Sequence, residues 1–240
     1  MSSFIYYWIC YNVIDNNNNW KSEYMSKRAI IFDLDGTLWE TLDSSHAALN
    51  TIIKEYGVKE VSKELMIQNF GNNIFEGAKL FFPYLDQDKA IEILNKADEL
   101  NIKTIQENGG YLYPGLEEAL FTLQQNYDLY IVSNTATKRY IEAFLTSSRL
   151  FKYFKDYSAA AEIVLSKGNA VVKLMDDFYI EEAIYVGDTA KDREAANIAN
   201  LPFIQCLYGF GPDLGCKYKI NEMSELPDMV EKVFNDIESK

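Results

Sequence analysis

The feature that most constrains the fold is an apolar run, residues 29–32, that leads directly into Asp33-Leu34-Asp35-Gly36-Thr37. This pattern predicts a buried strand that ends in a turn, because glycine lets the backbone change direction sharply. Two carboxylates spaced two residues apart point the same way, so Asp33 can act as a nucleophile while Asp35 moves protons. Their crowded negative charge favours a hard cation such as Mg²⁺. A plain strand-to-helix turn is the alternative interpretation.

Three further polar positions follow, and each comes behind an apolar run that we interpret as a strand. Residues 128–132 precede Ser133 and Asn134, and residues 163–166 precede Lys167. Residues 183–186 precede the segment that holds Asp188 and Asp192. In an open parallel sheet the carboxyl ends of the strands gather at one edge, where ligands bind. We therefore expect a hydroxyl, an amide, a lysine and two carboxylates to converge on Asp33.

A long helical stretch separates the first predicted strand from the others. We expect one helix from Asp43 or Ser44 to Gly57, others at about 59–70 and 74–82, and a longer one from Asp86 to Gly109. From residue 114 onward, helices and strands alternate, which is typical of a parallel α/β architecture. The predicted fold is therefore α/β, with a Rossmann-like parallel sheet core, residues 26–41 and 112–240, and an inserted all-helical domain, residues 42–111.

Composition and charge restrict the class of protein and the partners. The chain has 240 residues, 48% of them hydrophobic, which excludes a disordered protein. A formal net charge of -13 argues against nucleic acid and anionic membranes as partners. Three cysteines without metal or disulfide spacing favour a cytoplasmic protein. The single histidine, His46, excludes histidine-based zinc sites and Ser-His-Asp triads.

Residues 1–25 differ from the rest of the chain. The apolar stretch 4–10 is too short to cross a bilayer, and an asparagine run at 16–19 follows it. We interpret the segment as an N-terminal extension, either a mis-called start upstream of a true initiator at Met25 or a mobile tail. A membrane-surface anchor is the alternative.

The order and placement of these motifs resemble the haloacid dehalogenase superfamily of phosphohydrolases over about residues 28 to 235. The resemblance implies that Asp33 attacks phosphorus to form an aspartyl-phosphate, with Asp35 as acid and then base. It implies Mg²⁺ held by the Asp33 carboxylate, the Asp35 backbone carbonyl and Asp188, with Asp192 nearby. The helical insert matches the cap domain of this superfamily, a lid that would exclude water from the reaction. Alternatively, the insert has no role in chemistry.

The same resemblance implies the residues that bind phosphate. Ser133, Asn134 and Lys167 would contact the phosphoryl oxygens, with Gly36 and Thr37 as supporting residues. Ser133 and Asn134 could instead cap the next helix, and Thr37 could simply start one. Many family members have proline after this lysine, whereas Gly168 follows it here, which changes how the backbone presents Lys167.

Retention of Asp35 points to phosphate esters as substrates, and the form Gly187-Asp188-Thr189 looks most like phosphoglycolate phosphatase-like members. We expect a Mg²⁺-dependent phosphatase that acts on a small phosphorylated metabolite. A phosphomutase of the β-phosphoglucomutase type is the first alternative, and a non-catalytic phosphate-binding domain is the second. The mutase type uses a cap histidine near His46, which we interpret instead as a helix-surface or packing residue. The sequence indicates neither the substrate nor the oligomeric state.

Overall fold

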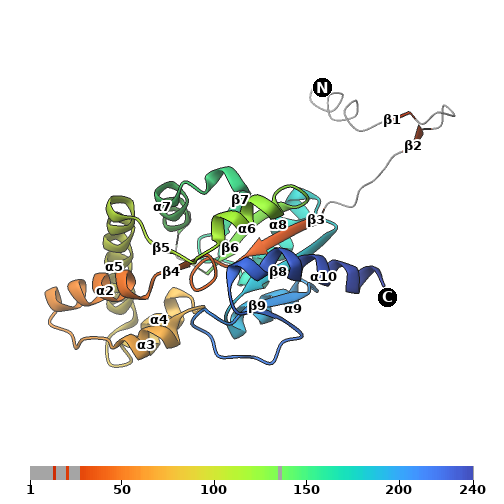
Figure 1. The fold of residues 1–240 in the computed structure, drawn as a ribbon. Coiled ribbons are helices and arrows are strands. Elements are labelled where there is room, and N and C mark those ends of the chain that lie inside the picture. Colours follow the sequence, from red (N-terminus) through yellow and green to blue (C-terminus); the bar gives the residue numbers. More distant parts are fainter. Residues whose placement is uncertain (1–12, 15–19, 22–27, 135–136, 240) are drawn as a thin grey trace, which may run out of the picture.

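A computed structural model describes residues 13–14, 20–21, 28–134 and 137–239 (Figure 1). Its main feature is a six-stranded parallel sheet in the order β10-β9-β8-β3-β6-β7. The strands are β3 (Arg28–Phe32), β6 (Asp128–Ser133), β7 (Phe154–Ala159), β8 (Glu182–Gly187), β9 (Phe203–Cys206) and β10 (Tyr218–Ile220). This architecture confirms the predicted α/β fold class.

Strand β3 lies in the middle of the sheet because both of its faces are apolar. Its side chains alternate between two hydrophobic clusters: Ile30 and Phe32 belong to one, and Ala29 and Ile31 to the other. Helices on both sides cover these faces. The first cluster packs against α6 (Leu116–Leu123), α7 (Lys138–Ser148) and α10 (Leu226–Glu238), and the second against α8 (Lys167–Phe178) and α9 (Ala190–Ile198).

Four helices form a separate hydrophobic cluster beyond the ends of the strands, in the direction in which β3 points (Figure 1). They are α2 (Leu42–Glu55), α3 (Lys63–Asn69), α4 (Ile74–Phe81) and α5 (Gln87–Asn108). The chain enters this group through β4 (Trp39–Glu40) and leaves through β5 (Tyr111–Leu112), and these two short strands pair antiparallel. The division of the chain into core and cap domains is our interpretation of this arrangement.

The helix starts follow local capping chemistry. Asp86 caps α5, as predicted, by accepting a hydrogen bond from the backbone N–H of Asp88 at 3.0 Å. The first cap was predicted wrongly: α2 has Thr41 at its N-cap position rather than Asp43 or Ser44. Thr41 does not cap with its side chain, because its hydroxyl donates to Asp35 instead.

The prediction of a strand at residues 163–166 is wrong. That segment is a turn in which Val164 adopts a φ of 56°, and the strand before Lys167 is β7. Strand β7 was not predicted, because it lies at the edge of the sheet and mixes polar with apolar residues. The short strands β4, β5 and β10 were not predicted either, since two or three residues carry too little periodicity.

The prediction for residues 1–25 falls outside the described residues, apart from β1 (Val13–Ile14) and β2 (Trp20–Lys21), which pair antiparallel. None of the helices in the described ranges has the length and apolar character needed to cross a membrane.

Candidate active site

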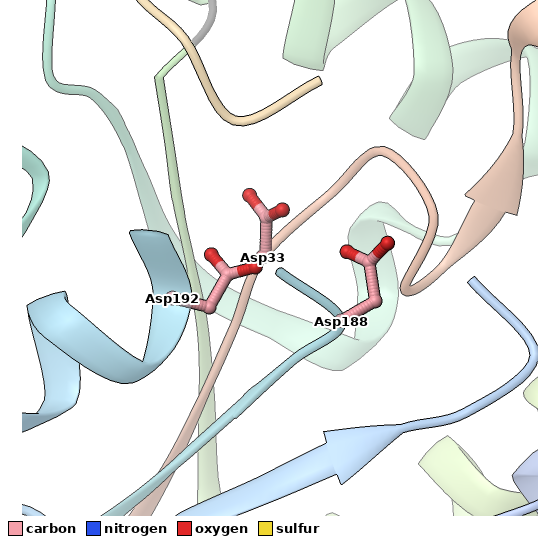
Figure 2. Close-up of side chains that lie close together, drawn as sticks. All are labelled: Asp33, Asp188 and Asp192. Atoms are coloured by element: carbon pink, nitrogen blue, oxygen red, sulfur yellow. The ribbon is translucent and has the colours of Figure 1, made fainter. Parts of the chain in front are cut away.

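Adjacent strands bring the predicted residues to one edge of the sheet. Asp33 follows β3, Ser133 ends β6, and Asp188 follows β8, and β3 pairs with both of the other strands. Asp192 comes from the first turn of α9. The carboxylates of Asp33, Asp188 and Asp192 lie within 4.8 Å of one another and are buried (Figure 2). The convergence of Asp188 and Asp192 on Asp33, expected from the sequence, is therefore present in the structure.

Lys167 joins two of these carboxylates. Its Nζ donates to Asp33 Oδ1 and to Asp192 Oδ1, both at 2.6 Å, and its side chain is 4% exposed. Burial alone lowers the pKa of Lys167, but the carboxylates of Asp192 and Asp33 outweigh burial and raise this pKa well above its usual value. The ammonium group therefore stays charged at physiological pH.

The aspartates are short of positive charge. Burial, followed by the carboxylate of Asp192, raises the pKa of Asp33 to about 7, although Lys167 acts in the opposite direction. Burial and the neighbouring carboxylates of Asp192 and Asp33 raise the pKa of Asp188 well above its usual value. The backbone N–H groups of Phe210 and Gly211, which donate to Asp188 Oδ2, oppose this rise. One ammonium among three carboxylates leaves an excess negative charge that a cation would balance.

The donor set fits magnesium. Three buried carboxylates supply hard oxygen ligands, which Mg²⁺ prefers, and the described part of the cluster contains no softer sulfur or imidazole ligand. One oxygen of Asp192 already has hydrogen-bond partners. Asp192 Oδ2 accepts from the backbone N–H of Thr189 at 2.8 Å and from the Thr189 hydroxyl at 2.7 Å. These bonds form the capping box of α9 and fix the position of the Asp192 carboxylate.

Asp35 has a different environment from Asp33. Three donors converge on its Oδ1: Trp39 Nε1 at 3.0 Å, Thr41 Oγ1 at 3.0 Å and the Tyr140 hydroxyl at 2.9 Å. Burial raises the pKa of Asp35, and these hydrogen bonds lower it again by a smaller amount. The crowding of donors on one oxygen leaves the other oxygen able to gain and lose a proton.

Trp39, Thr41 and Tyr140 are the site residues that sequence reasoning missed. Trp39 and Thr41 lie shortly after the aspartate motif, so their proximity to Asp35 is a signal that could have been used. Tyr140 is also a core residue of α7, since it is 4% exposed and belongs to the first hydrophobic cluster. A buried tyrosine hydroxyl needs a partner, and Asp35 provides it.

Glycine is required at position 36 because the backbone there lies close to the Asp188 side chain. The φ of Gly36 is 80°, and a Cβ at this position would lie 2.5 Å from Asp188 Oδ2. The Thr37 hydroxyl donates to Asp188 Oδ1 at a long 3.4 Å, and the Tyr208 hydroxyl donates to the Thr37 carbonyl at 2.9 Å. The turn after β3 is therefore held against Asp188.

Ser133 and Asn134 do not cap the following helix, since Thr137 occupies the N-cap position of α7. Ser133 lines the cavity described below, and Asn134 Nδ2 donates to the Gly71 carbonyl at 2.8 Å. Gly168, which stands where family members often have proline, lies in the first turn of α8. A Cβ here would lie 2.6 Å from Ile198 Cβ, so glycine permits the close contact of α8 with α9.

A cavity of about 190 Å³ separates this edge from helices α2–α5. Its floor includes Asp33, Asp35 and Lys167, and the segment 70–73 forms part of its helical wall. Phe70 stacks on Phe210 with ring centroids 3.9 Å apart, and Lys191 Nζ donates to Glu76 Oε1 at 3.0 Å. These contacts join the helical group to the sheet. His46 lies away from this cavity, where it contacts the Val61 carbonyl and Asn50.

Comparison with known proteins agrees with this geometry. The model of the haloacid dehalogenase-like hydrolase family matches residues 30–206, which is most of the chain. The chain belongs to this family. It is therefore a hydrolase, and the matched region runs from β3 to the end of β9 and includes all the residues of the acidic cluster and Lys167.

Individual relatives are more distant. Phosphoglycolate phosphatase of Salmonella choleraesuis is 24% identical over 88% of this chain and 90% of its own length. Among solved structures, a predicted phosphoglycolate phosphatase from Haemophilus somnus has a TM-score of 0.75 at 20% identity, over 86% of this chain and 99% of its own. A haloacid dehalogenase-like hydrolase from Streptococcus pneumoniae has a TM-score of 0.73 at 23% identity, over 85% and 99%. These structures show that the fold is shared.

Proposed function

We propose that this hydrolase is a Mg²⁺-dependent phosphatase that hydrolyses a small phosphate monoester through an aspartyl-phosphate on Asp33. The observation that carries the proposal is the contrast between the two aspartates of the motif. Asp33 is paired with Lys167 beside two further carboxylates, whereas Asp35 is held by neutral donors on one oxygen only. Paired carboxylates in different environments can take the different roles of nucleophile and acid.

In the first step, an Asp33 carboxylate oxygen attacks phosphorus as the bond from phosphorus to the leaving oxygen breaks. Asp35 gives its proton to that oxygen, so the alcohol departs neutral. In the second step, Asp35 takes a proton from water, the water oxygen attacks phosphorus, and the bond to Asp33 breaks to release phosphate. Bound Mg²⁺ would supply positive charge for the phosphoryl oxygens and would be held by Asp33, Asp188, the Asp35 carbonyl and, directly or through water, Asp192.

The remaining site residues bind and orient the phosphoryl group. Lys167 would neutralise phosphoryl oxygens, and its ammonium lowers the pKa of Asp33 and so favours the ionised form that a nucleophile requires. Ser133 and Asn134, next to the end of β6, would donate hydrogen bonds to phosphoryl oxygens. The helices over the cavity would keep bulk water from the aspartyl-phosphate.

The test is release of phosphate from a panel of small monoesters, with and without Mg²⁺. We expect turnover that requires the metal and that falls by at least about 10³-fold in Asp33→Asn, because the amide is not a nucleophile. Asp176→Asn, which changes an exposed aspartate of α8, is the matched control and should retain full activity. Turnover that survives in Asp33→Asn would contradict the proposal. Formation of an isomeric sugar phosphate without phosphate release would favour the mutase alternative.

A further inference from the structure

The helical wall of the cavity carries no basic side chain among the described residues. Lys167 is the only cationic residue that lines the described cavity, and its ammonium is already bonded to Asp33 and Asp192 on the floor. A substrate whose phosphoryl group lies on this floor would point its leaving group at the helical wall. A second negative charge on that leaving group would therefore find no cation there.

The charged group that this wall does carry is the carboxylate of Asp98. Asp98 lies on α5 and lines the cavity, and it makes no hydrogen bond or ion pair with any residue in the described ranges. Asp98 thus belongs to the helical wall toward which the leaving group would point, and Asp35 and Tyr140 line the same cavity. Burial and the charge of Asp35 raise the pKa of Asp98 to about 6, although the charge of Arg139, which does not line the cavity, acts in the opposite direction. The group is therefore mostly ionised at neutral pH.

A second acceptor lies one helical turn further along α5. Asn101 is 4% exposed and lines the same cavity. Its Nδ2 donates to Ser45 Oγ at 3.0 Å, while its Oδ1 has no hydrogen-bond partner. Residues three apart lie on the same helix face, so both acceptors are available to one ligand. A buried acceptor without a partner is costly unless a ligand supplies a donor.

We propose that Asp98 and Asn101 select leaving groups that present hydrogen-bond donors, hydroxyl or ammonium, and disfavour leaving groups that end in a carboxylate. This inference rests on the proposed phosphatase function and names its substrate class. It also separates this chain from the relatives that are named phosphoglycolate phosphatases. The carboxylate of glycolate would lie against Asp98, and the helical wall of the described cavity carries no cation to offset the repulsion.

Three two-carbon phosphate esters that differ only at the far end test the proposal. They are 2-phosphoglycolate with a carboxylate, 2-hydroxyethyl phosphate with a hydroxyl, and O-phosphoethanolamine with an ammonium. We expect kcat/KM to be at least about tenfold higher for the hydroxyl or ammonium ester than for phosphoglycolate. Whichever of these two esters is faster shows whether the site prefers a hydroxyl or an ammonium donor. A preference for phosphoglycolate would overturn the inference.

Variants at Asp98 show whether this carboxylate causes the preference. In Asp98→Asn the ratio of kcat/KM for the ammonium ester to that for phosphoglycolate should fall about tenfold, and in Asp98→Lys it should reverse. Glu107→Gln is the matched control, since Glu107 is exposed on the same helix and does not line the cavity, and it should leave the ratio unchanged. An unchanged ratio in both Asp98 variants would contradict the role of this residue.

Two further measurements separate failure of this inference from failure of the proposed function. The p-nitrophenyl group of p-nitrophenyl phosphate carries neither a carboxylate nor an ammonium, so Mg²⁺-dependent hydrolysis of this ester tests the phosphatase without reference to Asp98. Calorimetric binding of the three esters to Asp33→Asn with Mg²⁺ tests selectivity without turnover. Binding that favours the hydroxyl or ammonium ester would support the inference even without hydrolysis. Binding that favours phosphoglycolate would overturn it even if p-nitrophenyl phosphate is hydrolysed.

Discussion

At the scale of single residues, Asp35 depends on the groups that hold it. Trp39, Thr41 and Tyr140 all donate to the same oxygen, which fixes the rotamer of the carboxylate and leaves its other oxygen as the only place for a proton. Because these donors stabilise the ionised form, they limit how far burial raises the pKa of Asp35. Removing one of these donors should therefore raise the pKa of Asp35.

Tyr140→Phe should raise the pKa of Asp35, since it removes the hydrogen bond that lowers this pKa most. The first step needs Asp35 protonated, so the alkaline limb of the kcat/KM profile should move to higher pH. Loss of a hydrogen bond to a charged group should also reduce kcat/KM at neutral pH by about tenfold. Tyr157→Phe removes a similar bond, to Glu142, and serves as the control because neither residue lines the cavity. A shift of the limb to lower pH would contradict this account.

The sequence was most informative about the residues that end the central strands. Asp33 and Asp188 lie together as expected, because parallel strands bring their ends to one edge, and Lys167 and Asp192 join them from the first turns of α8 and α9. The donors around Asp35 could not be predicted in the same way. Tyr140 is 105 residues away from Asp35, and the 3.6-residue periodicity that places it in a core says nothing about where its hydroxyl points.

At the scale of elements, the position of Lys167 depends on how closely α8 approaches α9. Gly168 allows that approach, since a side chain there would meet Ile198. Gly168→Ala should therefore lower the free energy of unfolding by about 1–3 kcal/mol through overpacking, although alanine favours helix formation. Asn169→Ala, at the next and exposed position of the same turn, should change it by less than about 0.5 kcal/mol. Chemical denaturation of the three proteins measures both values, and an equally stable Gly168→Ala would contradict the packing argument.

Lys167 lies beside the acidic cluster as predicted, although the strand predicted directly before it is absent. The run 163–166 is apolar enough to suggest a strand, but it forms the turn after β7. The true strand β7 is amphiphilic, because an edge strand is only partly covered. Lys167 reaches the site all the same, since it begins α8 directly after this turn.

At the scale of the whole molecule, the helical group covers the edge of the sheet that carries the site. Folding also buries the Asp98 carboxylate, which makes its ionised form less favourable. Burial raises the pKa of Asp98 from 3.8 to about 6. The folded protein therefore binds more protons than the unfolded chain between about pH 4 and 6, and stability falls as the pH rises through this window. Above it, the ionised group destabilises the folded state by an amount on the order of 2–3 kcal/mol.

Asp98→Asn removes this titration. We expect the variant to be more stable than the wild type at pH 7, with a difference that shrinks through pH 6 to 4 and vanishes below. Urea denaturation across this range measures the effect, with Asp176→Asn as an exposed control that should show little change. A variant that is less stable at pH 7 would show that Asp98 has a structural rather than a ligand-binding role.

How the helices sit over the sheet was beyond prediction from the sequence. The stacking of Phe70 on Phe210 and the ion pair between Lys191 and Glu76 join segments that are far apart in the chain and carry no local signal. The sequence did indicate that four helices follow the first strand, because caps and breaks at Asp86, Gly57 and Gly109 are local features. It could not show that Asp98 lines the cavity.

The central claim is that Asp33 becomes phosphorylated, and trapping that species tests it most directly. p-Nitrophenolate leaves without a proton, so Asp35→Asn should complete the first step but lack the base for the second. After acid quenching with Mg²⁺ and p-nitrophenyl phosphate present, mass spectrometry should find one phosphoryl group on the peptide that contains Asp33, and none in Asp33→Asn. A wild-type enzyme that turns over, with no phosphoryl group on Asp33 in Asp35→Asn or with the group on another residue, would contradict the account.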